Sequence, residues 1–247
     1  MCSIGMAYIK RGIEEIIMNK TIIFDLDGTL TDSKEGILKS LEFALEAFGY
    51  DIPPYETQLL FLGPPIVDSL QQHCGMTIEQ AEEVYKKFGE RYGTIGKFEN
   101  QLYPNIIDLL AKVKNEHYTV ALATAKPEIY AREILDHFSI TPYFDVIVGA
   151  NHKEGLIHKK EILQKAIDLC GNPLTDDTGR RLVYMVGDRK YDVVSGNELG
   201  CISIGVTYGY GTEKELIEAN AEYLCEDTDD IVMTLDLEEM LIRSHAI

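Results

Sequence analysis

Basic side chains are scarce in this sequence. It has 23 lysines and arginines against 41 aspartates and glutamates in 247 residues, which gives a formal net charge of −18 at pH 7. So much negative charge repels the phosphate backbone of nucleic acids and the anionic surface of membranes. We therefore expect no nucleic acid and no membrane as a partner, and we favour a small ligand.

Cysteine is also sparse and follows no pattern. The cysteines are odd in number and none stands in a CxxC pair, which argues against a disulfide framework and against a zinc cluster, and agrees with a reducing cytosol. The five are Cys2, Cys74, Cys170, Cys201 and Cys225.

Long apolar runs are missing as well. No stretch approaches the roughly 20 apolar residues of a membrane helix, and residues 1–20 lack the apolar run of a secretory signal. We therefore expect a soluble, cytoplasmic protein. The first strong strand pattern begins only after Lys20, so we interpret residues 1–20 as an N-terminal extension without function, because chain termini are usually loosely held.

The patterns that are present favour an α/β fold. A chain of this length can bury one substantial core and carry one inserted subdomain. Strand and helix patterns alternate in residues 103–247, whereas residues 34–102 show only helical spacing. Alternation predicts a Rossmann-like parallel sheet with helices on both faces, formed by residues 21–33 and 103–247, with residues 34–102 inserted as a helical cap. We expect strands at 21–24, 119–124, 144–150, 181–187, 201–206 and 222–225, and helices at 33–49, 65–73, 77–92, 105–117, 127–138, 159–169, 193–199, 213–219 and after 229.

Polar side chains cluster at the expected strand ends. In an open α/β sheet the ligand site lies beyond the carboxyl ends of the strands, so polar residues there are the first candidates for chemistry. No cysteine is among them, so thiol chemistry is unsupported. The candidates are Asp25, Asp27, Thr124, Lys126, Asp145 and Asp188.

The acid pair in the segment DLDGT points to phosphoryl chemistry. Asp25 can act as a nucleophile on a phosphate, provided that a cation neutralises both charges, and this implies Mg²⁺. Asp27 is then free to protonate the leaving group and to activate water. Gly28 permits the unusual backbone that such a turn needs. Taken alone, the segment is also compatible with a simple capped turn.

Two further segments offer groups for a phosphate. The hydroxyl of Thr124 and the neighbouring amide of Ala125 lie ahead of a helix, where a phosphate binds well, although a threonine there is as often an N-cap. Lys159 and Lys160 open another helix, an unfavourable place for cations that predicts a compensating anion. The simpler alternative is a solvated lysine paired with a nearby glutamate.

The segment GDRKYD adds two carboxylates after a buried strand. Asp188 and Asp192 are four residues apart, so both can lie on one face of a helical turn and present oxygen ligands to a cation. An ordinary N-cap is the competing interpretation. It is improbable that the polar residues of all four segments are there for separate structural reasons. Their occurrence together at strand and helix ends favours one shared site.

These residues resemble, in order, the four motifs of the haloacid dehalogenase-like hydrolases, in the phosphatase branch of that superfamily. DLDGT is similar to the first motif, Thr124 to the second, Lys159 to the third and GDRKYD to the fourth, from Thr21 onward. The KxEIL pattern favours Lys159 over Lys160. The segments FLGPP, ATAKPE and SIGVTYGYG look like those of phosphoglycolate phosphatases and 5'-nucleotidase-like phosphatases, which carry a helical cap.

The resemblance implies a mechanism and a set of ligands. Asp25 would form an aspartyl-phosphate and Asp27 would be the general acid and base. Thr124 and Lys159 would bind the phosphate. Mg²⁺ would be held by Asp25, the backbone carbonyl of Asp27 and Asp188, with Asp192 bound directly or through water. We therefore expect a phosphoric monoester hydrolase, monomer or homodimer, whose partner is a small phosphorylated metabolite of the phosphoglycolate or nucleoside monophosphate class.

Other functions remain open to different degrees. A haloacid dehalogenase would not need Asp27, and a phosphonate hydrolase would need a reactive cap lysine, whereas cap lysines usually lie on helix surfaces. A phosphosugar mutase shares the core residues and differs only in the phosphoryl acceptor. A non-catalytic phosphate-binding regulator is disfavoured by the intact acid pair. Cap aromatic residues such as Tyr92 could contact a nucleobase, but packing is the simpler interpretation.

Overall fold

A six-stranded parallel sheet forms the centre of the fold, as expected. The structure is a computed structural model that describes residues 20–171 and 181–245. The expected N-terminal extension lies outside the described residues apart from Lys20. The strand order is β5-β4-β1-β6-β7-β8, with Phe24 of β1 in register with Leu122 of β4 and Val186 of β6. The strands are β1 (Thr21–Phe24), β4 (Thr119–Pro127), β5 (Val146–Ala150), β6 (Val183–Gly187), β7 (Ile202–Val206) and β8 (Tyr223–Cys225).

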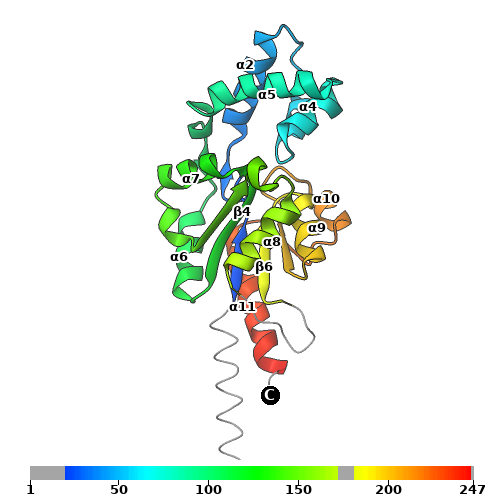
Figure 1. The fold of residues 1–247 in the computed structure, drawn as a ribbon. Helices are drawn as coiled ribbons and strands as arrows, with labels where there is room; N and C mark the ends of the chain where they lie inside the picture. Colours follow the sequence, from blue (N-terminus) through cyan, green and yellow to red (C-terminus); the bar gives the residue numbers. More distant parts are fainter. Residues whose placement is uncertain (1–19, 172–180, 246–247) are drawn as a thin grey trace, which may run out of the picture.

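Helices cover both faces of this sheet, which explains the continuous apolar runs of its strands. Side chains alternate between the faces: Ile22 and Phe24 pack on one side, and Ile23 packs on the other. Helices α6 (Ile106–Asn115), α7 (Glu128–His137) and α11 (Thr228–His245) contribute to the first core, and α8 (Lys159–Leu169) to the second (Figure 1). The sheet domain also contains the helices α9 (Lys190–Glu198) and α10 (Glu213–Glu218) and the short 3-10 helices η3 (Thr141–Tyr143) and η4 (His152–Glu154).

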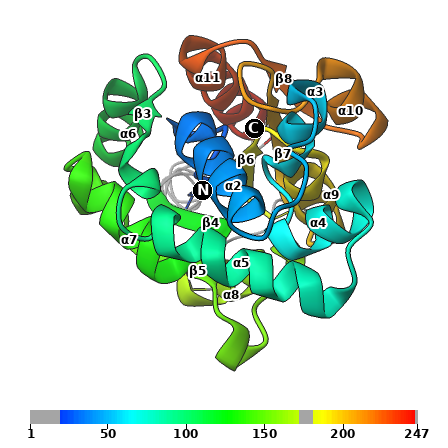
Figure 2. The same cartoon turned by 90° about the horizontal axis from the view of Figure 1, so that it is seen from above.

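A separate helical unit lies over the carboxyl ends of the strands (Figures 1 and 2). We call residues 34–98 the helical insertion, because they lie in the sequence between β1 and β4, which are neighbouring strands of the sheet. The insertion has its own apolar core, which includes Leu41, Leu45, Phe61 and Leu70. Its elements are α2 (Lys34–Ala47), α3 (Tyr55–Gln58), η1 (Leu59–Phe61), α4 (Ile66–Cys74), α5 (Ile78–Tyr92) and η2 (Gly96–Phe98).

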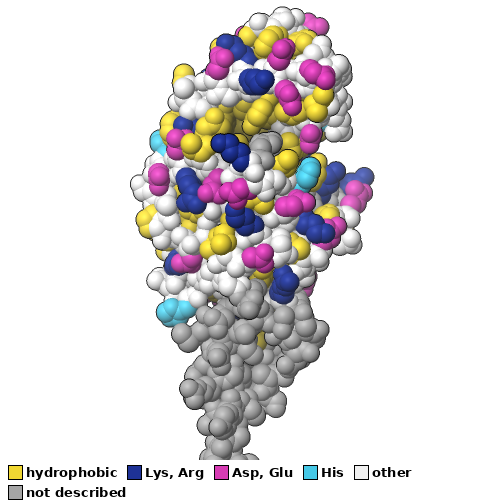
Figure 3. Space-filling view, in the orientation of Figure 1, with side chains coloured by type: hydrophobic (Ala, Val, Ile, Leu, Met, Phe, Trp, Pro, Cys, Tyr) yellow, Lys and Arg dark blue, Asp and Glu magenta, His cyan; other side chains and the backbone are white. Residues whose placement is uncertain are grey.

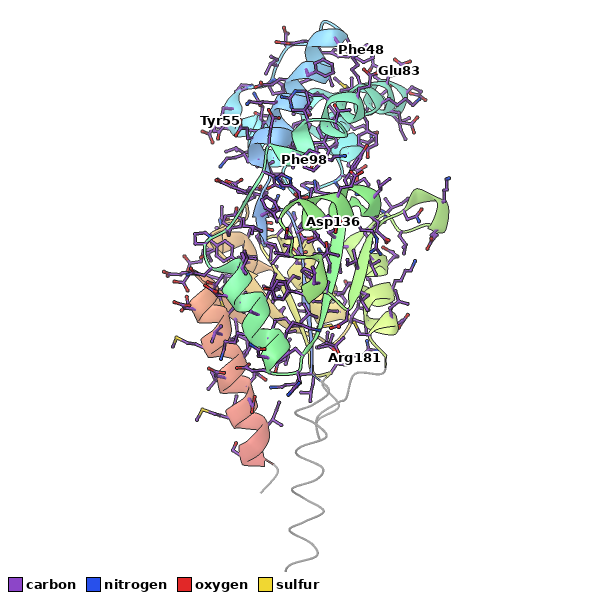
Figure 4. The ribbon with its side chains drawn as sticks, turned by 90° about the vertical axis from the view of Figure 1, so that its left-hand side faces the viewer. Phe48, Tyr55, Glu83, Phe98, Asp136 and Arg181 are labelled. Atoms are coloured by element: carbon purple, nitrogen blue, oxygen red, sulfur yellow. The ribbon has the colours of Figure 1, made fainter. Side chains whose placement is uncertain are left out.

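Two adjacent chain crossings join the insertion to the sheet. Strands β2 (Thr31–Asp32) and β3 (Gln101–Leu102) pair antiparallel, so the outgoing and returning chains lie side by side. Such two-residue strands leave no alternation in the sequence, which is why the sequence does not predict them. Beside this junction Phe98 packs against His137 of α7 with ring centroids 4.9 Å apart and ring planes tilted by 41°. Figure 4 shows Phe98 on the side of the insertion that faces the sheet.

No helix among the described residues is both long enough and apolar enough to cross a membrane. On the face shown in Figure 3, acidic and basic side chains are interspersed over the sheet domain, and apolar side chains gather where the insertion meets it.

Candidate active site

The loop after β1 presents the two acids of DLDGT. The amide of Asp25 still donates to the carbonyl of Val186 at 2.9 Å, so Asp25 lies where the β1–β6 ladder ends. The chain then turns sharply, and the amides of Leu30 and Thr31 both donate to the carbonyl of Leu26. Gly28 has φ +83°, a backbone conformation that residues other than glycine rarely adopt. The turn therefore holds both carboxylates at the carboxyl edge of the sheet.

Three carboxylates, one from the loop after β1 and two from the segment after β6, converge at this edge. One oxygen each of Asp25, Asp188 and Asp192 lies within 4.8 Å of the others, and all three residues are buried. Burial, with the neighbouring charges of Asp192 and Asp25, raises the pKa of Asp188 well above its usual range. Burial likewise raises the pKa of Asp192 to about 6. Three buried anions repel one another, so this cluster stores unfavourable free energy that a bound cation would relieve.

Lys159 from the start of α8 compensates part of that charge. Its Nζ lies 2.7 Å from Oδ1 of Asp25 and 2.6 Å from Oδ1 of Asp192, and it also donates to the carbonyl of Ala123 at 2.6 Å. Burial lowers its pKa, but the two carboxylates more than offset this and the pKa lies above its usual value. Lys160, by contrast, is exposed and pairs with Glu198 at 2.8 Å. Of the two lysines, Lys159 is the one that reaches the acids.

Asp27 faces a different partner. Its Oδ2 lies 3.0 Å from Nζ of Lys126, which follows Thr124 on β4 and also donates to the hydroxyl of Tyr92 at the end of α5. The other oxygen, Oδ1, is buried and has no hydrogen-bond partner among the described residues. Burial lowers the pKa of Lys126, but Asp27 and Tyr92 raise it to a net value above its usual range. Asp27 thus keeps one carboxylate oxygen anchored and one available.

Thr124 and Ala125 occupy the neighbouring strand end. Thr124 is buried on β4, two residues beyond the pairing of Leu122 with Phe24. Its Oγ1 accepts a hydrogen bond from the amide of Lys126 at 3.3 Å, and Ala125 is half-buried. Both lie at the same sheet edge as Asp25, where a phosphate bound to Asp25 would meet them.

The loop between β7 and α10 supports Asp188 from the other side. The amide of Tyr210 donates to Oδ2 of Asp188 at 2.7 Å, and the hydroxyl of Thr29 lies 3.3 Å from Oδ1. The hydroxyl of Tyr210 accepts from the amide of Ser33 at 2.7 Å and donates to Asp32 at 3.1 Å. Tyr210 therefore links an acid of the site to the chain crossing that leads into the insertion.

Arg189 makes a second link to the insertion. Its Nη1 donates to the carbonyl of Leu62, and its Nε lies 2.9 Å from Oε1 of Glu215 on α10. Gly63 packs directly on this side chain: an added Cβ would lie 2.8 Å from Nη1. The segment FLGPP of the insertion is thus seated on the residue next to Asp188.

The donor set fits a magnesium ion. Carboxylate oxygens are the ligands that Mg²⁺ prefers, and Asp25, Asp188 and Asp192 offer three of them in one buried cluster. Lys159 supplies a single positive charge to this cluster, so two negative charges would be uncompensated by Lys159 when all three acids are ionised. The cluster therefore has both the oxygen ligands and the excess charge that a divalent cation requires.

One candidate from the sequence was placed wrongly. Asp145 stands at the amino end of β5 and not at its carboxyl end, because the strand begins one residue after it. Its carboxylate accepts from the amide of Val120 at 2.8 Å and pairs with Lys114 at 2.7 Å, at the opposite edge of the sheet. The apolar run that includes Phe144 suggested a strand that starts too early.

The sequence does not predict the roles of four residues at the site, which are Lys126, Tyr92, Arg189 and Tyr210. Lys126 is recognisable only as a strand-end residue, and its contact with Asp27 carries no sequence signature. Tyr92, Arg189 and Tyr210 act across the junction between the insertion and the sheet, which no local pattern reveals. Burial raises the pKa of Cys201 to about 12 and that of Cys225 to about 11, so these two thiols are poorly suited to act as nucleophiles.

The arrangement has clear parallels among known proteins. A family model described as haloacid dehalogenase-like hydrolase matches residues 22–206. The chain is 34% identical over 206 residues to a 5'-nucleotidase from Pseudomonas aeruginosa, covering 83% of this chain and 90% of that protein. It is 29% identical over 225 residues to a phosphoglycolate phosphatase from Haemophilus influenzae, covering 87% and 98%. A crystal structure of a predicted phosphatase from Clostridium acetobutylicum superposes with a TM-score of 0.81 at 33% identity, covering 88% and 98%.

Proposed function

The chain belongs to the haloacid dehalogenase-like hydrolases, and from this premise we propose that it is a magnesium-dependent phosphatase that cleaves a small phosphate monoester through a phosphorylated Asp25. Its relatives and structural neighbours indicate a hydrolase of phosphate esters. The proposal adds the metal, the covalent intermediate and the class of substrate, which is a phosphoglycolate or a nucleoside monophosphate.

One observation carries the proposal. Residues from four segments far apart in the sequence meet at one sheet edge, and each is of the type that phosphoryl transfer requires. Asp25 is a carboxylate held by Lys159 on one side, with Asp188 and Asp192 beside it, and Asp27 lies two residues further along the loop. A purely structural cluster would have no reason to bury three acids against only one lysine.

The roles follow from position. Asp25 would attack the phosphorus atom, so that a bond forms between its oxygen and phosphorus while the bond to the leaving oxygen breaks. Asp27 would give a proton to that leaving oxygen and later take one from a water molecule. The oxygen of this water would bond to phosphorus while the bond from Asp25 to phosphorus breaks, which releases phosphate and restores the Asp25 carboxylate. The unpartnered Oδ1 of Asp27 is suited to both transfers.

The phosphate would be held by groups that already face Asp25. The ammonium of Lys159 would stabilise charge on the transferring phosphoryl group, and the hydroxyl of Thr124 and the amide of Ala125 would orient its oxygens. Asp25, the backbone carbonyl of Asp27, Asp188 and Asp192 would hold Mg²⁺, the last directly or through water. When bound, Mg²⁺ supplies the positive charge that lets an anionic nucleophile approach a dianionic ester.

The helical insertion would act as a cap over this site. It contacts the sheet domain through Tyr92 on Lys126 and through the carbonyl of Leu62 on Arg189, both next to site residues. Closure of such a lid excludes bulk water, which would otherwise compete at the phosphoryl group.

A substrate panel tests the proposal. Phosphate release is measured from phosphoglycolate, nucleoside monophosphates, sugar phosphates, phosphoserine, phosphotyrosine and pyrophosphate, each with Mg²⁺ and with chelator. Release that needs Mg²⁺ and is concentrated on phosphoglycolate or on the nucleotides is the expected result. Equal release in chelator would contradict the metal requirement, and no release from any ester would overturn the proposed phosphatase.

A further inference from the structure

Lys126 lies at the interface between the insertion and the sheet domain. Its side chain is 5% exposed, and its ammonium group joins Asp27 of the β1 loop to the hydroxyl of Tyr92 on α5. A single ammonium group therefore bridges the proposed acid and a side chain of the insertion. A leaving group that Asp27 protonates would lie close to this ammonium group.

Lys126 and Tyr92 each have a hydrogen-bond donor that these contacts do not use. An ammonium group has three N–H donors, and among the described residues Lys126 uses them only toward Asp27 and Tyr92. The Tyr92 hydroxyl accepts from Lys126, and burial raises its pKa to about 12, so it keeps a proton of its own to donate. Two donors, one of them cationic, thus remain beside Asp27.

Aromatic side chains pack around Tyr92. Its ring stacks on Phe88 with centroids 5.2 Å apart and meets Tyr130 edge-on at 5.7 Å. Gly93 packs on Tyr130 so closely that an added Cβ would lie 2.9 Å from its hydroxyl. Tyr92 and Phe88 are 2% and 6% exposed, so these two rings offer little surface on which a nucleobase could stack.

Resting on the function proposed above, we propose that Lys126 and Tyr92 form a subsite for an anionic group on the leaving group, and that the preferred substrate is a short phosphorylated hydroxy acid. The cation beside Asp27 would bind the carboxylate of that acid. Nζ of Lys126 lies 3.0 Å from Oδ2 of Asp27, and Oδ1 of the same carboxylate would donate the proton. The leaving oxygen and the substrate carboxylate would therefore be separated by only a short carbon link.

The second buried lysine of the site cannot serve this purpose. Lys159 is engaged by Asp25 and Asp192 and faces the phosphoryl side of the site. Lys126 is the cation on the side of Asp27. A leaving group with a negative charge could accept a hydrogen bond from the remaining donor of Lys126, whereas a neutral nucleoside would offer that donor no charged acceptor.

A matched pair of substrates isolates the carboxylate. Phosphoglycolate and 2-hydroxyethyl phosphate have nearly the same size, but only the first has an anionic leaving group. We expect wild-type protein to favour phosphoglycolate in kcat/KM by at least about tenfold, which corresponds to about 1.4 kcal/mol. Lys126→Met should reduce that preference by about tenfold or more, and Lys126→Arg should retain part of it, since it keeps the charge.

Two further variants sharpen the comparison. Tyr92→Phe removes the second donor and should reduce the preference for phosphoglycolate by a smaller factor. Lys87→Met is the control: Lys87 also lies on α5, but its ammonium pairs with Glu90 of the same helix and not with Asp27, so both kcat/KM values should stay unchanged.

The outcomes distinguish the two proposals. Equal losses on both substrates in Lys126→Met would mean that Lys126 only positions Asp27, and would overturn the subsite, as would a wild-type preference for nucleoside monophosphates. Wild-type protein that hydrolyses neither substrate, nor p-nitrophenyl phosphate, would instead refute the proposed phosphatase.

A measurement on wild-type protein alone guards against misfolded variants. Glycolate should inhibit the hydrolysis of p-nitrophenyl phosphate competitively, because its carboxylate can occupy the subsite. Ethylene glycol at the same concentration should not inhibit. Equal inhibition by the two compounds, or none by glycolate, would contradict the subsite.

Discussion

The backbone of Gly28 lies directly against the carboxylate of Asp188. A Cβ at position 28 would be 2.5 Å from Cγ and 2.7 Å from Oδ1 of Asp188, distances that real side chains do not tolerate. The loop that bears Asp25 and Asp27 can therefore approach the segment after β6 only because this position has no side chain. The acids of the site owe their proximity to this contact.

Gly28→Ala should separate these two segments. The added methyl group must displace Asp188, and the φ of +83° adds backbone strain, so we expect a loss of stability above about 1 kcal/mol and a large fall in kcat. Gly49→Ala is the matched control, since Gly49 has φ +72° but nothing within 4 Å of an added Cβ. It should lose stability only, measured by denaturant unfolding, and keep its kcat. Similar kcat values in the two variants would contradict the importance of this contact.

Asp25→Asn should abolish turnover. An amide cannot form the acyl-phosphate, so kcat should fall by about 10⁴-fold or more, the scale seen when one member of a catalytic unit is removed. Phosphate release and trapping of the phosphorylated protein are the measurements. Asp145→Asn is the control, because that acid lies at the opposite sheet edge with Lys114 and should leave kcat unchanged. An active Asp25→Asn variant would remove Asp25 from the role of nucleophile.

Asp27→Asn should slow hydrolysis in a way that depends on the leaving group. For an alkyl ester, whose leaving oxygen needs a proton, we expect a fall in kcat of about 10² to 10⁴-fold. For p-nitrophenyl phosphate, whose leaving group departs as an anion, the fall should be much smaller. The same loss on both esters, or a loss of the folded state in circular dichroism, would argue for a structural role.

Magnesium should stabilise the protein more at neutral pH than in mild acid. The pKa of Asp192 is raised to about 6, above its ordinary value of 3.8, so its contribution to stability is complete below the lower value and is lost as the pH rises through about 6. Asp188 is shifted in the same direction. Deprotonation destabilises the free protein but creates the ligands for the ion.

Thermal unfolding with Mg²⁺ and with chelator, at about pH 5 and about pH 7.5, measures this effect. At the higher pH the ion should stabilise the folded state by about 2.7 kcal/mol when its concentration is a hundredfold above its dissociation constant. Asp236→Asn, which alters an exposed acid of α11, should behave like wild type. A stabilisation that is equal at both pH values would contradict the assignment of these acids as ligands.

Arg189→Ala should loosen the helical insertion. The variant loses the hydrogen bond to the Leu62 carbonyl and leaves Glu215 without its ion pair, and a hydrogen bond from a charged donor contributes about 1.5 to 3 kcal/mol. We expect KM to rise about tenfold with a smaller change in kcat. Lys190→Ala, at the neighbouring position, should keep the wild-type KM. A fall in kcat alone would show that Arg189 does not act through the insertion.

The sheet and most of the site are accessible from the sequence because both depend on local patterns. Buried parallel strands leave apolar runs such as that of residues 183–187, and parallel strands bring their carboxyl ends to one edge. These two rules are enough to place Asp25, Thr124 and Asp188 together. The error at Asp145 arose because a run of apolar residues does not mark the residue at which a strand begins.

The sequence by itself thus determined the class of fold and the groups gathered at the sheet edge, since strand direction follows from the alternation of strands and helices. Only the tertiary structure decided which lysine meets which acid. Lys159 reaches Asp25 because of where α8 begins, and Lys126 reaches Asp27 under Tyr92 because the insertion packs over the end of β4. Contacts of this second kind join residues far apart in the chain through packing, and packing between distant segments leaves no periodic signal in the sequence.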